Sequence, residues 1–264
     1  MITLDNQTIL QISNIAIEAG TIAMGYYKSD ITIDKKDDNS PVTKADLAAN
    51  DFILKQLKKI DNTIPILSEE TLIEWTERKK WITYWLVDPL DGTKEFINKN
   101  DEFTVNISLI ENNIPVVGII YAPALSSLYF AKKNYGSFKI ISSSILKSLD
   151  LAKPIKVLKK NKIRIIGSRS HSNDKFISWT KNNFDSYDLI IKGSSLKFCE
   201  IAEGKADIYP RFGPTSEWDI AAGHLILEEA GGYIKDTNDK KILYNTKESL
   251  INPEFIAFNF NDLI

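Results

Sequence analysis

The sequence predicts an α/β protein that folds as a layered αβαβα sandwich in two lobes. The chain begins with two segments of helical periodicity, and its middle carries short apolar runs at strand spacing. Its second half alternates strand-like runs with helical segments, an order typical of strands buried between helices. The 264 residues are enough for a substantial core, and the 43% hydrophobic content is ordinary for a globular protein.

Two helices are predicted at the start of the chain. Between residues 4 and 28, isoleucines and alanines recur at the spacing that buries one helix face. A polar stretch at 34–40 is predicted as a loop or hairpin tip. The second helix runs from about Thr43 to Lys59. Thr43 followed three residues later by Asp46 is typical of a helix start, because the hydroxyl caps free amides and the carboxylate favours the positive end.

The middle of the chain is predicted to form strands. They lie at residues 64–67, 81–87, 103–109, 114–121 and 128–131. The strand at 103–109 alternates apolar with polar side chains, which predicts that only one of its faces is buried. The pair Asn112-Asn113 is a turn signal, so the next strand is predicted to be its antiparallel partner.

The second half of the chain is predicted to alternate strands and helices. Strands at 163–166 and 189–191 each lead into a polar segment, and a helix covers 220–230. The preceding segment, 142–160, is polar and weakly patterned. It places the lobe boundary between residues 143 and 144, which gives lobes of 1–143 and 144–264.

The net charge and the cysteine content limit which partners the protein can bind and which cellular compartment suits it. The formal net charge of −2 provides no global field for a nucleic acid polymer or an anionic membrane, so an anion must be bound by a local arrangement. Cys199 is the only cysteine, which excludes an intrachain disulfide and favours a reducing compartment. No apolar run is long enough to span a bilayer and no secretory signal is recognised, so we expect a cytoplasmic protein. Peripheral membrane association leaves no recognisable mark, and no pattern decides between a monomer and a homodimer.

Four carboxylates lie at predicted strand ends or helix starts, where loops place functional groups: Glu69, Asp88, Asp91 and Asp219. Mg²⁺ prefers oxygen ligands in octahedral geometry and binds through a few carboxylates, waters and substrate phosphate. Two such ions roughly 3.5–4 Å apart clamp the attacking and leaving oxygens of a phosphoryl group. The four residues therefore predict a two-metal phosphate-hydrolysing site.

The run Asp88-Pro89-Leu90-Asp91-Gly92-Thr93 suits that site for local reasons. Its proline keeps the preceding aspartate extended at a strand end, and the second aspartate follows after a tight turn. The Leu90 carbonyl lies between them as a third oxygen. The amides of Gly92 and Thr93 are predicted to open a helix whose positive end faces a phosphate. A lone Asp-x-x-Asp is usually a turn with a solvated charge, and the fixed proline and glycine make this run far more specific.

Three segments in this order resemble the inositol monophosphatase superfamily: 68–70, 88–93 and 218–223. The resemblance covers essentially the whole chain. Four further segments are similar to the bisphosphate nucleotidase branch of that superfamily: 84–87, 94–97, 193–199 and 209–214. The resemblance implies hydrolysis of the 3′-phosphate of adenosine 3′,5′-bisphosphate to AMP and phosphate, linked to sulfate assimilation, with Mg²⁺ required and Li⁺ inhibitory.

The resemblance also implies residue roles. Two or three Mg²⁺ ions are held by Glu69, Asp88, the Leu90 carbonyl, Asp91 and Asp219. The catalytic residues are Asp46 and Thr93, which orient the attacking water, and Glu69. Substrate is contacted by Gly92, Thr93, Ser168, His171, Gly193, Ser195, Lys197, Arg211 and Asp219. Lys197 is the first choice for the second phosphate, because a phosphate carries ~1.5–2 negative charges near neutral pH.

Several alternatives stay open on the residues alone. Asp46 is equally well explained as a helix-start carboxylate, and His171 as a loop histidine without a ligand. The same metal site also suits an inositol or sugar monophosphatase. A non-catalytic phosphate-binding regulatory protein is a third reading, and against it none of the four carboxylates is replaced. The sequence does not decide between 3′ and 2′ phosphates.

Overall fold

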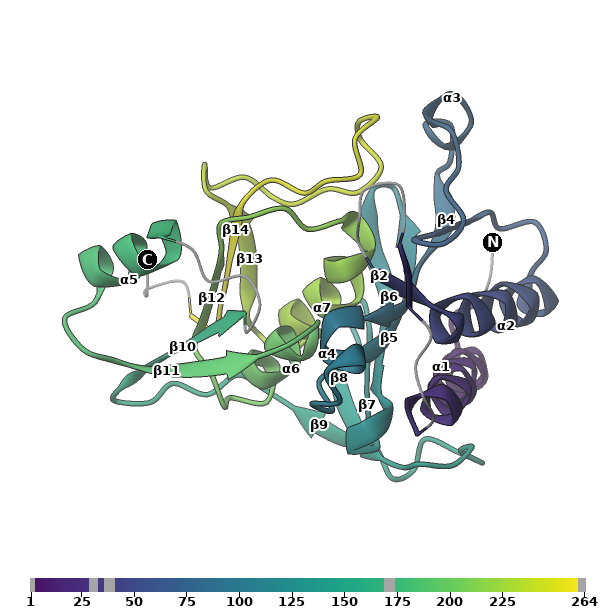
Figure 1. The fold of residues 1–264 in the computed structure, drawn as a ribbon, viewed down its shortest axis with the longest axis horizontal. Coiled ribbons are helices and arrows are strands. Elements are labelled where there is room, and N and C mark those ends of the chain that lie inside the picture. The colour runs from purple at the N-terminus through teal and green to yellow at the C-terminus, as the bar shows by residue number, and fades with distance from the viewer. Residues whose placement is uncertain (1–2, 29–32, 36–40, 169–173, 261–264) are drawn as a thin grey trace.

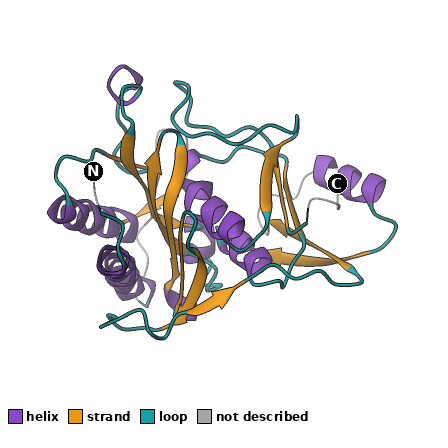
Figure 2. Cartoon of the chain, turned by 180° about the vertical axis from the view of Figure 1, so that it is seen from behind, coloured by secondary structure: helices purple, strands orange, loops and turns teal. Residues whose placement is uncertain are grey.

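The chain forms the predicted αβαβα sandwich, as a computed structural model of residues 3–28, 33–35, 41–168 and 174–260 shows (Figure 1). Two long helices, α1 (Asn6–Tyr27) and α2 (Lys44–Ile60), cover the outer face of a seven-stranded sheet. Helices α6 (Leu196–Ala202) and α7 (Glu217–Glu229) lie between this sheet and a five-stranded sheet, and both views place α7 there (Figure 2). Helix α5 (Asp174–Asn183) covers the outer face of the second sheet.

The larger sheet has the strand order β3-β4-β5-β6-β7-β8-β9. Its strands are β3 (Ile66–Ser68), β4 (Thr83–Asp91), β5 (Thr104–Glu111), β6 (Ile114–Ala122), β7 (Ser127–Lys132), β8 (Gly136–Ile141) and β9 (Lys153–Ile155). Only β3 and β4 are parallel, and the other pairs are antiparallel. Asn112 and Asn113 have positive φ angles of 50° and 65°, so the predicted turn between β5 and β6 is confirmed.

The smaller sheet has the order β11-β10-β12-β14-β13. Its strands are β10 (Ile163–Ser168), β11 (Tyr187–Lys192), β12 (Ile208–Arg211), β13 (Tyr233–Asp236) and β14 (Phe255–Phe258). Strands β1 (Ile33–Lys35) and β2 (Pro41–Thr43) pair with each other, and short helices α3 (Trp75–Arg78), η1 (Pro123–Leu125) and α4 (Thr93–Ile97) complete the described elements. The predicted hairpin tip falls partly on residues 36–40, outside the described part of the chain.

The helix starts follow the predicted chemistry. In α2 the Asp46 carboxylate accepts from the Thr43 backbone N–H at 2.8 Å, while the Thr43 hydroxyl accepts from Ala45 N–H at 3.2 Å. Helix α7 begins at Glu217, three residues before the predicted start, because Ser216 and Asp219 form the same kind of capping box. None of the helices in the described ranges is long and apolar enough to cross a membrane.

Strand β5 differs from its prediction. It was expected to bury one face, yet Thr104, Asn106 and Ser108 on its polar face are at most 1% exposed. Helix α7 and the loop that begins at Gly193 cover this face. Polar side chains on a covered face must find partners within the protein. The polar side of β5 is therefore an internal contact between the two halves of the chain.

The predicted boundary at 143/144 precedes the last strand of the larger sheet. Strand β9, at 153–155, still pairs with β8. The chain passes to the smaller sheet through residues 156–162. Helix α7, which belongs to the second half of the sequence, packs against the larger sheet. The two lobes therefore interlock, and the boundary stays a prediction.

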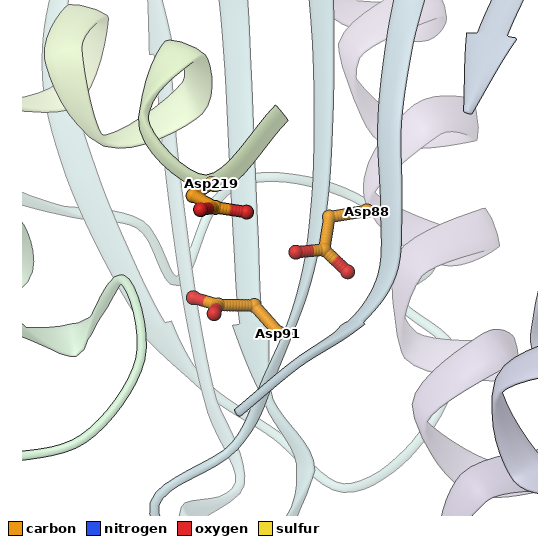
Figure 3. Close-up of side chains that lie close together, drawn as sticks. All are labelled: Asp88, Asp91 and Asp219. Atoms are coloured by element: carbon orange, nitrogen blue, oxygen red, sulfur yellow. The ribbon is translucent and has the colours of Figure 1, made fainter. Parts of the chain in front are cut away.

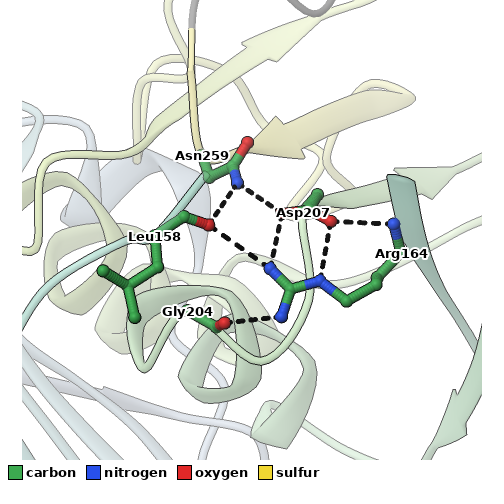
Figure 4. Close-up of polar contacts among 5 residues, drawn as sticks. All are labelled: Leu158, Arg164, Gly204, Asp207 and Asn259. Carbon is green, nitrogen blue, oxygen red and sulfur yellow. Dashed lines mark hydrogen bonds and ion pairs between the residues drawn. The ribbon is translucent and has the colours of Figure 1, made fainter. Parts of the chain in front are cut away.

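A buried ion pair joins three strand ends of the smaller sheet (Figure 4). Asp207 accepts from the Arg164 guanidinium at 2.7 and 2.8 Å and from the Asn259 side-chain amide at 2.6 Å. Arg164 also donates to the Gly204 carbonyl at 2.6 Å. A buried pair of this kind stabilises only when its remaining polar atoms are satisfied, as most of them are here. The contacts fix the ends of β10, β12 and β14 relative to one another.

Candidate active site

Two of the predicted metal ligands are brought to one side of β4 by a bulge. Asp88 lies opposite Asn106 on β5 and Asp91 opposite Thr104, so three steps along β4 match two steps along β5. In a regular strand, residues three apart point to opposite faces, and one extra residue restores the same face. The tight turn predicted after Asp88 takes the form of this bulge, in which the Leu90 N–H donates to Asp88 Oδ1 at 3.0 Å, the contact of an Asx turn. Strand β4 continues to Asp91, and the bulge brings the carboxylates of Asp88 and Asp91 close together, as expected of the turn.

The third ligand arrives from the other half of the chain. Asp219 lies in the first turn of α7, where its Oδ2 accepts from Ser216 N–H at 2.8 Å. The positive end of the helix favours a carboxylate there. One carboxylate oxygen from each of Asp88, Asp91 and Asp219 lies within 4.8 Å of the other two (Figure 3). The structure thus brings together three of the four predicted acidic residues as one cluster.

The cluster is electrostatically unfavourable without a cation. Burial raises the pKa of Asp91 to about 6, and Lys197 and the Ser195 N–H oppose this shift. Burial, together with the neighbouring carboxylates, also raises the pKa values of Asp88 and Asp219 well above the usual range. No lysine or arginine in the described ranges forms an ion pair with the three carboxylates. A like-charged group of oxygen donors, with Asp88 buried and Asp91 and Asp219 partly buried, fits a hard divalent cation such as Mg²⁺.

Glu69 and Leu90 lie at the same cavity but outside the three-aspartate cluster. Glu69 follows β3, and its backbone N–H donates to the Val87 carbonyl at 3.1 Å, which fixes it beside β4. The Leu90 N–H donates to Asp88 Oδ1 at 3.0 Å. Its carbonyl accepts from the Thr93 hydroxyl at 3.4 Å. Their roles as metal ligands stay predictions.

Asp46 caps a helix and also contacts the Thr93 hydroxyl, while its role toward the attacking water stays a prediction. Its Oδ2 accepts from the Thr43 backbone and hydroxyl at 2.8 and 2.6 Å, as a helix-capping carboxylate does. Its Oδ1 accepts from the Thr93 hydroxyl at 3.3 Å. Burial raises the pKa of Asp46, and its bonds to Thr43 oppose the shift. One carboxylate therefore caps α2 and orients Thr93 with separate oxygens.

Most of the predicted substrate contacts line the cavity that holds the acidic cluster. They are Gly92, Thr93, Ser168, Ser195, Lys197, Arg211 and Asp219. Gly193 lies just behind the wall, where a Cβ atom would meet Glu95 Cγ at 2.6 Å, so a larger residue does not fit. His171 lies outside the described residues.

Two buried cationic side chains lie in the wall of this cavity. Lys197 is 6% exposed, and its Nζ donates to the Ser194 carbonyl. Burial lowers the pKa of Lys197 to about 8, although the Asp91 carboxylate opposes the shift. Arg211 donates from Nη2 to the Pro214 carbonyl at 2.8 Å, whereas its buried Nε has no acceptor among the described residues. An unpaired buried N–H costs free energy unless a ligand accepts from it.

Sequence reasoning missed several polar residues around the site. Glu95 is 6% exposed and lines the cavity, and Glu102 accepts from Gly193 N–H at 2.8 Å. Thr104 and Asn106 contact the Ser195 hydroxyl at 2.8 Å each. The only signal for the last two was the polar face of the predicted strand at 103–109. That pattern does not reveal whether water or another part of the protein covers the face.

The comparisons with known proteins agree with this geometry. The model of the inositol monophosphatase family matches residues 5–259. The protein named 3′(2′),5′-bisphosphate nucleotidase CysQ in Salmonella typhimurium is 43% identical over 247 residues, which are 93% of this chain and 97% of that protein. The protein of the same name in Haemophilus influenzae is 38% identical over 263 residues, 97% of this chain and 94% of its own length.

Solved structures extend the comparison to the fold. The crystal structure of CysQ from Bacteroides thetaiotaomicron, described as a bacterial member of the inositol monophosphatase family, superposes with a TM-score of 0.87 at 37% identity. The match covers 97% of this chain and 98% of that one. An IMPase from Thermotoga maritima superposes with a TM-score of 0.76 at 23% identity, covering 94% of this chain and 90% of the other. The second match shows a shared fold alone.

Proposed function

Because the chain belongs to the inositol monophosphatase family, we propose that it is a metal-dependent phosphatase that converts adenosine 3′,5′-bisphosphate to AMP and phosphate. One observation carries the proposal: the acidic cluster of Asp88, Asp91 and Asp219 shares its cavity with Lys197 and Arg211. The cavity thus offers a metal site for the reacting phosphate and a cationic site for a second one. The nearly full-length similarity to named bisphosphate nucleotidases supports this substrate class.

Mg²⁺ is the proposed metal, held as two or three ions by Asp88, Asp91 and Asp219, with Glu69 and the Leu90 carbonyl completing the set. When bound, the metal lowers the pKa of water and neutralises phosphate charge. The aspartates are held for this role by neighbouring N–H groups. Asp88 accepts from Leu90, Asp91 from Ser195 and Asp219 from Ser216. Such partners fix the direction of the remaining oxygens.

Thr93 and Asp46 are proposed to orient the attacking water. The Thr93 hydroxyl has one hydrogen, which either Asp46 Oδ1 at 3.3 Å or the Leu90 carbonyl at 3.4 Å accepts, so its oxygen is left to accept a hydrogen bond from water. The water is thereby turned toward the phosphorus with a lone pair free for attack. Phosphoryl transfer depends mainly on such positioning and on charge neutralisation. Glu69 is proposed to act with these residues, and its position in the lining of the same cavity supports this.

The second phosphate is proposed to contact Lys197 and the unpaired Nε of Arg211. Both groups are desolvated in the protein, so an anion that reaches them replaces missing interactions. Gly92, Ser168, His171, Gly193 and Ser195 remain proposed contacts to the rest of the nucleotide. An inositol monophosphate has only one phosphate and leaves the cationic site without a partner. The bisphosphate therefore fits the cavity better.

The proposed setting is a reducing cytoplasm, where adenosine 3′,5′-bisphosphate arises from sulfate assimilation and sulfotransfer. The single cysteine, Cys199, is unpaired and fully buried, which suits that compartment. The proposed partner is the small nucleotide itself.

A substrate comparison tests the proposal. Purified protein with Mg²⁺ is given adenosine 3′,5′-bisphosphate, inositol 1-phosphate and fructose 1,6-bisphosphate separately, and released phosphate is measured. We expect kcat/KM for the nucleotide to exceed that for inositol 1-phosphate by at least about tenfold, because a hydrogen bond to a charged group contributes roughly 1.5–3 kcal/mol. We also expect a lower kcat/KM for fructose 1,6-bisphosphate, which has a second phosphate but lacks the nucleoside. We also expect Li⁺ to suppress the reaction. Equal or faster hydrolysis of inositol 1-phosphate would contradict the assignment of a nucleotide substrate but not the proposed metal site.

A further inference from the structure

Asn106 of β5 connects the acidic cluster to Ser195, which directly precedes the helix α6 that contains Lys197. Its Oδ1 accepts from the Ser195 hydroxyl at 2.8 Å and from the Thr104 hydroxyl at 3.0 Å. Because that oxygen faces two hydroxyls, its Nδ2 is the atom that faces Asp91, with Oδ2 3.5 Å away. A carboxylate only accepts hydrogen bonds, so this orientation of the amide is the favourable one.

The same Asp91 carboxylate oxygen also accepts a hydrogen bond from the backbone of the loop at Ser195. Ser195 N–H donates to Asp91 Oδ2 at 2.5 Å. Ser195 is therefore held at two points, by Asn106 through its hydroxyl and by Asp91 through its amide. Lys197 follows two residues later in α6. The Asp91 carboxylate is thereby linked through Ser195 to the start of the helix that contains Lys197.

We propose that Asn106 is a positioning residue that couples metal binding at Asp91 to the placement of the Ser195–Lys197 segment. It is 1% exposed and lies on β5 opposite Asp88, so the sheet fixes its backbone. With Oδ2 of Asp91 held by Ser195 and faced by Asn106, Oδ1 remains for the metal. Partners of this kind commonly set the affinity of a metal site. The inference rests on the proposed function and adds a residue that orients its parts.

Ser108 provides a matched control. It is two residues further along the same face of β5 and is also 1% exposed. Its hydroxyl donates to the Val117 carbonyl at 2.8 Å, within the larger sheet. Ser108→Ala therefore removes a buried hydrogen bond from the same strand without touching Asp91 or Ser195. Both Ser108→Ala and Asn106→Ala should lower the thermal midpoint.

The test compares Mg²⁺ affinity, measured by calorimetry on metal-free protein without nucleotide, with the KM for adenosine 3′,5′-bisphosphate. We expect Asn106→Ala to weaken Mg²⁺ binding by about tenfold or more and to raise KM, the range found when a residue that orients a metal ligand is lost. Ser108→Ala should leave both values within about twofold, because its lost bond lies elsewhere. An unchanged Mg²⁺ affinity in folded Asn106→Ala would overturn the proposal.

Ser195→Ala provides a second test of the proposal, which does not depend on whether Asn106→Ala folds. It removes the hydroxyl bond to Asn106 and keeps the backbone bond to Asp91. We expect a several-fold loss of Mg²⁺ affinity, because the Asn106 amide loses the hydroxyl that holds it beside Asp91. An unchanged Mg²⁺ affinity in Ser195→Ala would overturn the coupling. A wild-type protein that binds Mg²⁺ but hydrolyses no nucleotide contradicts the proposed function instead.

Discussion

Replacing Asp91 with asparagine should lower kcat/KM for adenosine 3′,5′-bisphosphate by at least about 1,000-fold, which corresponds to about 4 kcal/mol of lost transition-state stabilisation. The amide keeps the shape of the side chain but removes a negative charge from the group of three carboxylates. The measurement is phosphate release at saturating Mg²⁺. Asp150→Asn makes the same chemical change at an exposed position and should retain full activity.

Metal-free Asp91→Asn should at the same time be at least as stable as the wild type. Asp88 and Asp219 are both destabilised by the neighbouring Asp91 charge. Removal of that charge relieves the repulsion, and added Mg²⁺ should then raise the thermal midpoint less than it does in the wild type. Loss of activity caused by unfolding would give the opposite result, a lower midpoint without metal. Near-normal activity of the variant would contradict the role given to Asp91.

Lys197→Ala should raise the KM for the bisphosphate by about 10- to 100-fold, because a hydrogen bond to a charged group contributes roughly 1.5–3 kcal/mol. Hydrolysis of adenosine 3′-monophosphate, which lacks the second phosphate, should change by less than about threefold. Lys205→Ala is the matched control, since Lys205 is exposed, pairs with Glu203 and does not line the cavity. Equal losses on both substrates would remove Lys197 from nucleotide selection.

The same residue gives the wild type a pH dependence. The pKa of Lys197 is lowered to about 8, so its charged form is lost as the pH rises through that value. The KM for the bisphosphate should therefore increase above about pH 8 and stay flatter in Lys197→Ala. Titration of phosphate itself occurs near pH 6 and does not interfere in this range. A wild-type KM that stays constant between pH 7 and pH 9 would contradict the role given to Lys197.

Local chemistry predicted the ligands of the acidic cluster, but the arrangement that gathers them depends on long-range pairing. The run at 88–93 contains the aspartates, the proline and the glycine that suit a metal site. The bulge between Asp88 and Asp91 exists only against β5, which the run itself does not specify. The start of α7 was likewise missed by three residues, although Ser216 and Asp219 have the spacing of a capping box.

The layers of the fold were predictable because helix and strand periodicities are strong in this chain. The roles of polar residues on β5 were not, since alternation predicts a strand and leaves open what covers its polar side. The roles of Asn106 and Thr104 are visible only in the structure, where the loop at Ser195 packs on both side chains. The interlocking of the halves through α7 has the same origin: it is set by packing between distant segments.

The metal site is tested most directly by a crystal structure of the protein grown with Mn²⁺, in which anomalous scattering locates the ions. We expect ions bound by carboxylate oxygens of Asp88, Asp91 and Asp219, at about 2.1 Å as for hard divalent cations. Anomalous density elsewhere, with the three carboxylates bonded to one another and free of metal, would contradict it.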